Sequence, residues 1–248
     1  MLKARIKNVG EWKAVLNAIG DIVEDAMFIV NDAGITFRGM DAAHVALLDV
    51  TFPKSSFDLL ETKTSFFGLK VDDFKKIFNA CGNSDVVELD IEKEGLMKIT
   101  ITGSLNMEFT LRLIDKTTTN TPIPKIDYKV KAALDPTVLS RILTNIQPIS
   151  EYVSINCNYD KIQFSGKGDV GDARIDIHKG NPELRNLETV ETSSAVYSLD
   201  YMAKIIRSIG KATNSVSLEY STQNPIHMLF EMPSMVKVDY YLAPRIEN

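Results

Sequence analysis

The sequence has few of the residues that build disulfides or metal centres. Its two cysteines, Cys81 and Cys157, stand alone in the chain, far below the density of a secreted disulfide scaffold. A reducing compartment is therefore the expectation. The three histidines, His44, His178 and His227, lack the paired spacing that holds zinc, and neither cysteine has a cysteine or histidine partner nearby in sequence. We expect no catalytic residue, no metal and no cofactor.

Long hydrophobic runs are also missing. No apolar stretch reaches the roughly 20 residues of a membrane-spanning helix, so no membrane partner is expected. The first residues, Met1 to Ile6, alternate apolar and basic side chains, which predicts an edge strand rather than a signal peptide. The net charge of −5, taken alone, argues against a nucleic-acid binder.

Two short motifs suggest chemistry but lack the spacing for it. Gly166-Lys167-Gly168-Asp169 does not have the spacing of a phosphate-binding loop, and a turn at the end of a strand is the better interpretation. The aspartates 169, 172 and 176 lack the spacing of a calcium loop, so a solvated acidic loop is favoured over a metal cluster.

What the sequence does have is an internal repeat. Ile35–Gly39 returns as Ile162–Gly166, with the numbering shifted by 162 − 35 = 127. The apolar alternation of Val87–Ile91 returns at Val216–Tyr220, shifted by 216 − 87 = 129. Each half has the size of an ordinary domain, so the sequence predicts a duplicated domain. A duplicated domain also suggests that copies from several chains close into a symmetric ring.

Four segments have apolar residues at helical spacing, and most of the remainder alternates like strands. Asp135-Pro136 is an N-cap followed by a proline at the first helical position. Two short helices and many strands in each half predict an α+β fold. The helices are expected at about Val9–Ile22, Asp72–Ala80, Pro136–Gln147 and Leu199–Lys211. Strands are expected at Ala46–Phe52, Leu96–Thr102, Met107–Ile114, Ala173–Ile177 and Val236–Leu242, among others.

The predicted helices are more basic than the rest of the chain. Counted with the first helix cut at Ile19 and the other three as given above, seven basic side chains stand against four acidic ones, a charge of +3, which leaves −5 − 3 = −8 for the remainder. Lysines on an amphipathic helix are usually its solvated face. Their recurrence on four helices favours a surface that faces DNA through weak, salt-sensitive phosphate contacts. The seven residues are Lys13, Lys75, Lys76, Arg141, Lys204, Arg207 and Lys211.

A connector separates the two predicted domains, residues 1–114 and 128–248. It runs from Asp115 to Asp127, with polar threonines followed by two prolines, which predicts an extended and exposed linker. Ile123 and Ile126 are unusual in this polar segment. They either anchor the linker on the body or form one wall of an apolar groove for a partner peptide.

Two further runs carry a resemblance to a known family. Met40–Leu48 (Met-Asp-Ala-Ala-His-Val-Ala-Leu-Leu) and Tyr240–Glu247 (Tyr-Tyr-Leu-Ala-Pro-Arg-Ile-Glu) closely resemble proliferating cell nuclear antigen, the DNA sliding clamp of archaea and eukaryotes. Lys75-Lys76-Ile77, Ala80–Asn83 and Ile123-Pro124 also match, so the resemblance runs the whole length. The compact linker and the short tail look more like an archaeal clamp.

The resemblance implies a ring of three subunits, with helices inside and a continuous sheet layer outside. Such a ring encircles double-stranded DNA without gripping it, and makes or breaks no bond. DNA polymerase, flap endonuclease and DNA ligase would be tethered to it in replication and repair, and an ATP-driven clamp loader would open it. The expected location is the chromosome, in the cytoplasm of an archaeon or in a eukaryotic nucleus. The alternative is a paralogous subunit of a heterotrimer specialised for repair partners.

The same resemblance implies a hydrophobic pocket for a partner peptide. The peptide would present an aliphatic and two aromatic anchors on a short helical turn, with a glutamine near the terminal segment. Burial in the core is the competing explanation, particularly for Val45, Leu47 and Pro225. The implied pocket residues are Met40, His44, Val45, Leu47, Ile123, Tyr128, Pro225, Met232, Tyr241, Ala243, Pro244 and Ile246.

On the inner face, Lys13, Lys76, Arg141 and Arg207 match basic positions of the family. The sequence departs from the family at Gly20, Asn79 and Thr144, positions that are often basic in relatives. The resemblance therefore implies fewer positive charges facing DNA than is usual in the family.

The subunit interface implied by the resemblance pairs two strand edges. A strand near Met107–Leu113 would lie beside one near Ala173–His178 of the neighbouring subunit, which covers both exposed edges. Phe109, Leu111, Ile175 and Ile177 are interface or core residues.

Overall fold

The structure is a computed structural model of the 248-residue chain, and it describes residues 1–63, 65–92, 95–115 and 121–246. The chain forms two compact units, and each takes in one short segment from the other half of the sequence. Unit 1 comprises Met1–Ala42, Leu48–Thr121 and Met232–Val238; unit 2 comprises Ala43–Leu47, Pro122–Glu231 and Asp239–Asn248.

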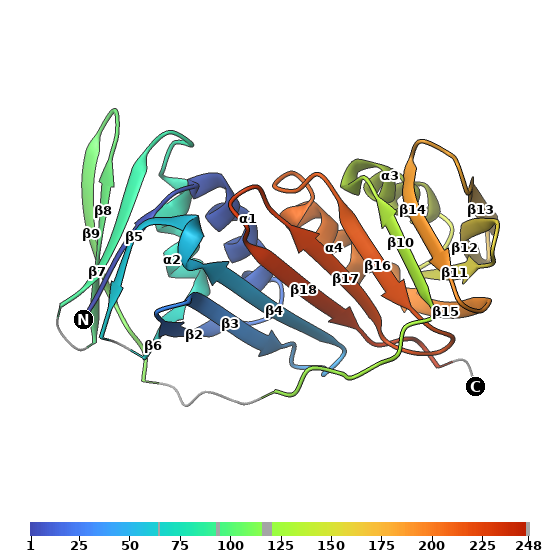
Figure 1. Cartoon of the computed structure of the whole chain (residues 1–248), viewed down its shortest axis with the longest axis horizontal. Helices are drawn as coiled ribbons and strands as arrows, with labels where there is room; N and C mark the ends of the chain where they lie inside the picture. Colours follow the sequence, from blue (N-terminus) through green and yellow to red (C-terminus); the bar gives the residue numbers. More distant parts are fainter. Residues whose placement is uncertain (64, 93–94, 116–120, 247–248) are drawn as a thin grey trace. The chain divides into compact units, whose positions relative to one another are not determined.

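Unit 1 contains the helices α1 (Val9–Gly20) and α2 (Val71–Asn79), which pack against each other (Figure 1). One antiparallel sheet has the strand order β5-β1-β7-β8-β9, and the strands β4-β3-β2-β6 are neighbours in that order in another. The strands are β1 (Leu2–Ile6), β2 (Asp25–Asn31), β3 (Gly34–Met40), β4 (Ala46–Pro53), β5 (Phe57–Thr62), β6 (Phe66–Lys70), β7 (Val86–Ile91), β8 (Leu96–Thr102) and β9 (Asn106–Arg112), with a short 3₁₀ turn at Lys54–Ser56.

Unit 2 repeats this plan. The helices α3 (Pro136–Ile146) and α4 (Leu199–Ile209) pack together, and the strand orders are β14-β10-β16-β17-β18 and β13-β12-β11-β15. The strands are β10 (Val130–Leu134), β11 (Tyr152–Cys157), β12 (Lys161–Gly168), β13 (Gly171–His178), β14 (Leu184–Thr189), β15 (Ser193–Ser198), β16 (Val216–Tyr220), β17 (Ile226–Glu231) and β18 (Lys237–Leu242).

The predicted duplication is confirmed down to strand register. In the hairpin β2–β3, Val30 faces Ile35, and in β11–β12, Cys157 faces Ile162, so both partners shift by the same offset, 157 − 30 = 162 − 35 = 127. The β1–β5 pair shifts register at Arg5/Ile6, and the β10–β14 pair shifts at Ala133/Leu134. The repeat therefore preserves a bulge as well as the regular ladders.

The four predicted helices and the five named strands are confirmed, with small changes at their ends. The first residues form a strand as predicted, but its prediction as an edge strand is wrong, because β1 pairs with β5 on one side and β7 on the other. The first helix was expected to reach Ile22, which is in phase with its apolar face, but α1 ends at Gly20. There the amides of Ile22 and Val23 both bond the carbonyl of Ile19, which tightens the last turn and ends the helix. Strand β9 ends at Arg112, short of the predicted end at Ile114.

Each unit buries a core between its helices and sheets. In unit 1, Trp12 of α1 stacks on Phe52 at 4.0 Å between ring centroids and on Phe78 of α2 at 5.8 Å. In unit 2, α3 and α4 bury the residues at helical spacing, including Leu139 and Ile206. Because the apolar faces point inward, the basic side chains of the helices remain on the outside.

The Gly-Lys-Gly run lies in a strand. Gly166 and Gly168 belong to β12 and face Ala173 and Gly171 of β13. A Cβ on Gly168 would lie 1.9 Å from the carbonyl oxygen of Ile149, so glycine is needed for close packing against the chain that follows α3. The motif is accounted for by packing.

The N-cap of α3 gives a stability prediction. The Asp135 carboxylate accepts bonds from the backbone amide and the hydroxyl of Thr137 at 2.8 and 2.7 Å. We expect Asp135→Ala to lower the free energy of unfolding by about 1 kcal/mol at pH 7, measured by urea denaturation. The Thr137 bonds lower the pKa of Asp135. The difference is therefore present above the unfolded pKa of about 3.9 and disappears as the pH falls through the folded value.

Ser198, the N-cap of α4, provides the matched control. Within the described residues, its side chain makes no capping hydrogen bond. We expect Ser198→Ala to change stability by less than about 0.5 kcal/mol. Equal losses at the two caps would contradict the assignment.

Candidate functional site

A hollow of about 300 Å³ in unit 2 lies between α3 and α4 and is bordered by two basic residues, one on α4 and one just beyond its end. Arg207 and Lys211 lie on its α4 side, and the α3 side presents the hydroxyls of Thr137, Ser140 and Thr144. Cationic groups and hydroxyls commonly donate hydrogen bonds to phosphate oxygens. Contacts of this kind do not depend on the base sequence.

Among the residues that the structure describes, three of the seven predicted DNA-facing cations have an acidic partner. The distances from the cationic nitrogen to the carboxylate oxygen are 3.3 Å for Lys76–Asp73, 2.8 Å for Lys204–Asp200 and 3.6 Å for Arg141–Glu183. All three pairs are exposed, where an ion pair contributes about 0–1 kcal/mol, so the cations can exchange partners.

Lys13 and Lys75 are more firmly held. Lys13 Nζ donates a hydrogen bond of 2.5 Å to the carbonyl of Cys81, just beyond α2. Lys75 is half-buried and lies over Gly20, where an added Cβ would meet Lys75 Nζ at 3.0 Å. The glycine at a position that is often basic in relatives therefore leaves room for a lysine from the neighbouring helix.

Seven of the predicted pocket residues belong to unit 2 and have half-exposed side chains. The Ala243 amide donates to the Val45 carbonyl at 2.9 Å, which fixes the terminal segment to the central run. The rings of Tyr128 and Tyr241 both lie beside the ring of His227, which is described below. We call this set the partner surface. It comprises Val45, Ile123, Tyr128, Pro225, Tyr241, Ala243 and Pro244.

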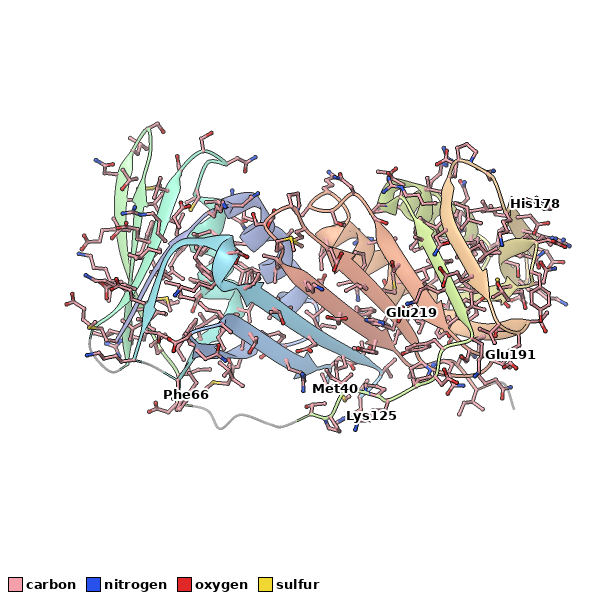
Figure 2. All side chains as sticks on the ribbon, in the orientation of Figure 1. Met40, Phe66, Lys125, His178, Glu191 and Glu219 are labelled. Atoms are coloured by element: carbon pink, nitrogen blue, oxygen red, sulfur yellow. The ribbon has the colours of Figure 1, made fainter. Side chains whose placement is uncertain are left out.

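The other predicted pocket residues differ in exposure. Leu47 is buried in the core, as the competing explanation proposed for it, and Met232 of unit 1 is buried too. Met40, half-buried, ends β3 in unit 1 (Figure 2), whereas Ile246 is exposed. His44 is exposed with a φ of 58°, a left-handed conformation that is uncommon outside glycine. Their roles stay predictions.

The ring of His227 lies at the centre of a group that sequence reasoning missed. Its Nδ1 lies 2.9 Å from Glu219 on β16, and its Nε2 lies 2.7 Å from Asp239 on β18. The ring stacks on Tyr241 with a centroid distance of 4.6 Å and an angle of 11° between the planes. Tyr128 lies 6.1 Å away at 24°. His227 thus contacts two residues of the partner surface.

Two carboxylates set the charge of His227. Burial disfavours the charged ring and by itself lowers the pKa, but hydrogen bonds to Asp239 and Glu219 outweigh it and raise the pKa of His227 above its ordinary value. Burial likewise raises the pKa of Glu219, but bonds from Lys131 and His227 outweigh it, so this pKa is lowered. The charges alternate across β10, β16, β17 and β18, and Figure 2 labels Glu219 within this row.

A pH dependence of stability follows. Because the folded pKa of His227 is raised, its contribution is complete below the unfolded value of about 6.5 and is lost as the pH rises through the folded value. We expect wild type to be more stable than His227→Gln at pH 6 in urea unfolding, with the difference shrinking towards pH 9. His44→Gln, at an exposed position outside the helices and strands, should leave this pH dependence in place. A constant difference across this range would contradict the charge assignment.

The two strands predicted at the subunit interface both lie at sheet edges. Among the described residues, β9 pairs with β8 alone, and β13 pairs with β12 alone (Figure 1). Phe109, Leu111 and Ile175 are half-exposed on these strands, whereas Ile177 belongs to the core of unit 2. The two edges therefore carry unpaired backbone groups beside partly exposed apolar side chains.

The remaining reactive side chains are structural. Asp176 accepts hydrogen bonds from Arg174, Lys161 and Gln163, and these lower its pKa.

The part of the chain that the structure describes contains no cluster of acidic, histidine or cysteine residues able to hold a metal ion. Burial raises the pKa of the Cys81 and Cys157 thiols. None of the described helices is long and apolar enough to cross a membrane.

Two copies of one α+β unit, each with a helix pair packed on antiparallel sheets, define the class of duplicated clamp proteins. The family profiles for the N-terminal and C-terminal domains of proliferating cell nuclear antigen match residues 1–116 and 122–245. The chain belongs to the proliferating cell nuclear antigen family.

Individual relatives agree with this assignment. The chain is 36% identical over 246 residues to the DNA polymerase sliding clamp of Cenarchaeum symbiosum (strain A), covering 99% of this chain and 98% of the relative. It is 33% identical, with the same coverage, to the DNA polymerase sliding clamp of Nitrosopumilus maritimus (strain SCM1). The solved proliferating cell nuclear antigen of Thermococcus kodakaraensis matches with a TM-score of 0.94 at 22% identity, over 99% of this chain and 100% of that chain, a likeness of fold.

Proposed function

We propose that the protein is a DNA sliding clamp: a ring subunit that encircles duplex DNA and tethers DNA polymerase and other DNA-processing enzymes. The observation that carries the proposal is the full-length match to relatives named DNA polymerase sliding clamps, at up to 36% identity among those described above. Flap endonuclease, DNA ligase and a clamp loader belong to the proposal as expected partners.

The charge distribution suits a clamp that slides. A topological link needs no tight phosphate binding, and the helices offer a modest set of cations of which several already pair within the chain. The protein as a whole carries −5, so its other surfaces repel DNA and favour threading over adsorption.

For ring closure, we propose that β9 of one subunit pairs with β13 of the next. Both strands are open at one edge in the described chain, and both present apolar side chains at that edge. Three identical chains would give a mass of 3 × 27.7 = 83.1 kDa.

The oligomer prediction uses one disrupting variant. By light scattering behind a sizing column, we expect wild type to have the mass of three chains. Ile175→Asp should have the mass of one chain, 27.7 kDa, because a carboxylate cannot be buried at this edge without a partner. Val190→Asp replaces an exposed valine in the same unit and should stay trimeric. The mass of a single chain for wild type would contradict homotrimer formation.

The same samples test encirclement. Rings threaded onto a linear duplex, whose ends are then blocked by streptavidin, should remain bound at 1 M salt and leave when one block is cut off. Contacts to phosphates alone weaken steeply with salt, so they would not survive this wash. Loss of wild type from doubly blocked DNA would exclude a closed ring, and Ile175→Asp should be lost in every case.

For partner binding, we propose that the partner surface takes a peptide with a glutamine, an aliphatic residue and two aromatic residues on one helical turn. Its half-exposed proline, valine and tyrosine side chains suit aromatic anchors, and backbone bonds such as Ala243 to Val45 hold it in place.

A charge placed on this surface should abolish the binding. We expect Val45→Asp to weaken such a peptide at least about 30-fold, which corresponds to about 2 kcal/mol, in fluorescence anisotropy, while the trimer and its retention on blocked DNA persist. Val190→Asp is the matched control, with the same substitution at an exposed site. Unchanged affinity of Val45→Asp would place the peptide elsewhere.

A further inference from the structure

His227 is almost covered by its surroundings, yet it contacts the partner surface from within the sheet. The residue is 8% exposed, and its ring lies against Tyr241 and close to Tyr128. Tyr241 follows Asp239 closely on β18, so one strand carries both a carboxylate partner of His227 and the tyrosine stacked on it. The ring is therefore placed to fix the orientation of Tyr241, with Tyr128 beside it.

The geometry requires a doubly protonated ring. Both ring nitrogens lie within hydrogen-bond distance of a carboxylate oxygen, at 2.9 Å for Glu219 and 2.7 Å for Asp239. A carboxylate can only accept, so each nitrogen must donate, and the neutral imidazole has a single N–H. After loss of a proton, one carboxylate faces a nitrogen lone pair in a covered site and has to move away.

The duplication supports a cation at this place. In unit 1, Asp90 faces Lys98 across β7 and β8, as Glu219 faces His227 across β16 and β17, and the numbering shifts by 129 in both cases (219 − 90 and 227 − 98). Lys98 forms its ion pair with another carboxylate, Glu108, at 2.8 Å. A permanently charged lysine in one copy thus corresponds to a titratable histidine in the other.

We propose that His227 is a positioning residue of the partner surface: as an imidazolium held between Glu219 and Asp239, it keeps the rings of Tyr241 and Tyr128 in the orientation that receives the aromatic anchors of the peptide. Peptide binding is then coupled to one proton on His227. This inference rests on the proposed partner surface.

The charged and titratable groups around the ring come from four elements. Glu219 faces it from β16, Asp239 and Tyr241 face it from β18, and Tyr128 faces it from the segment before β10. Lys131 on β10 bonds Glu219 at 2.6 Å and keeps this carboxylate ionised. Burial raises the pKa of Tyr128, so its phenol stays neutral throughout the range in which His227 titrates.

The test measures peptide affinity from pH 6 to pH 9. The probe is a synthetic peptide with the glutamine and three apolar anchors named above, acetylated and amidated at its ends and free of histidine, so that it does not titrate in this range. For wild type, we expect the Kd to rise above the folded pKa of His227, by up to about tenfold per pH unit. Nuclear magnetic resonance of the His227 ring should give the same midpoint in the unmodified protein.

Variants of the clamp separate a positioning role from a general structural one. His227→Gln should give a Kd that does not change with pH. Asp239→Asn removes one of the two carboxylates that stabilise the charged ring, and its amide can pair with either form of the ring. The midpoint of the pH dependence of the Kd should therefore move to lower pH. Of the other two histidines, His178 lies on the strand proposed for ring closure and is left unchanged, and His44→Gln should keep the pH slope even if it binds more weakly.

The outcomes that overturn the inference are distinct from those that overturn the proposed function. Peptide binding to wild type with no pH slope, a slope that persists in His227→Gln, or a slope abolished by His44→Gln would refute the role of His227 and leave the partner surface standing. Failure of wild type to bind the peptide at every pH would refute the partner surface itself, and the inference with it. If the variants do not fold, disagreement between the ring midpoint and the Kd midpoint in wild type decides against it.

Discussion

The packing of each helix pair onto its sheets is the interaction on which the rest of the structure depends. Residues at a spacing of three and four, such as Trp12 and Leu16 in α1, fill the space over strands that alternate inward and outward. This packing fixes which side of every helix meets solvent. The basic residues follow from it, since the side opposite the core is the one place where they remain hydrated.

The sheets distribute the other functions. Side chains that point away from the helices form the outer face, and there unit 2 carries the row from Lys131 to Asp239 together with Tyr241. The sheet edges at β9 and β13 are left for association. In the function proposed above, helix face, sheet face and sheet edge would serve three kinds of contact, and a change in one need not disturb the others.

The sequence predicted the elements well because their signals are local. Apolar spacing located the helices, and the internal repeat predicted the duplication. The His227 group was missed because Glu219, His227 and Asp239 come from three strands and meet only once register is known. Alternation within β16, β17 and β18 does put them on the face opposite the core, which is the signal that could have found them.

Side-chain partners over long distances were equally invisible in the sequence. Nothing local indicated that Lys13 would donate to the carbonyl of Cys81, or that Lys75 would lie over Gly20. Burial was also undecided for residues that the family resemblance placed in the pocket, and the structure separates covered Leu47 from half-exposed Val45. Such distinctions depend on neighbours that are remote along the chain.

The register shift shared by the β1–β5 and β10–β14 pairs has a consequence for the history of the chain. An irregularity at equivalent places in two copies is most simply inherited from one parent, so the bulge is older than the gene duplication. The parent was then a single domain that already had this bent sheet. A ring of six such domains, before any fusion, would have had six identical outer faces. After fusion the two copies could diverge, so their outer faces no longer had to be identical. The presence of histidine at position 227, where the other copy has lysine at the equivalent position 98, is one trace of that divergence.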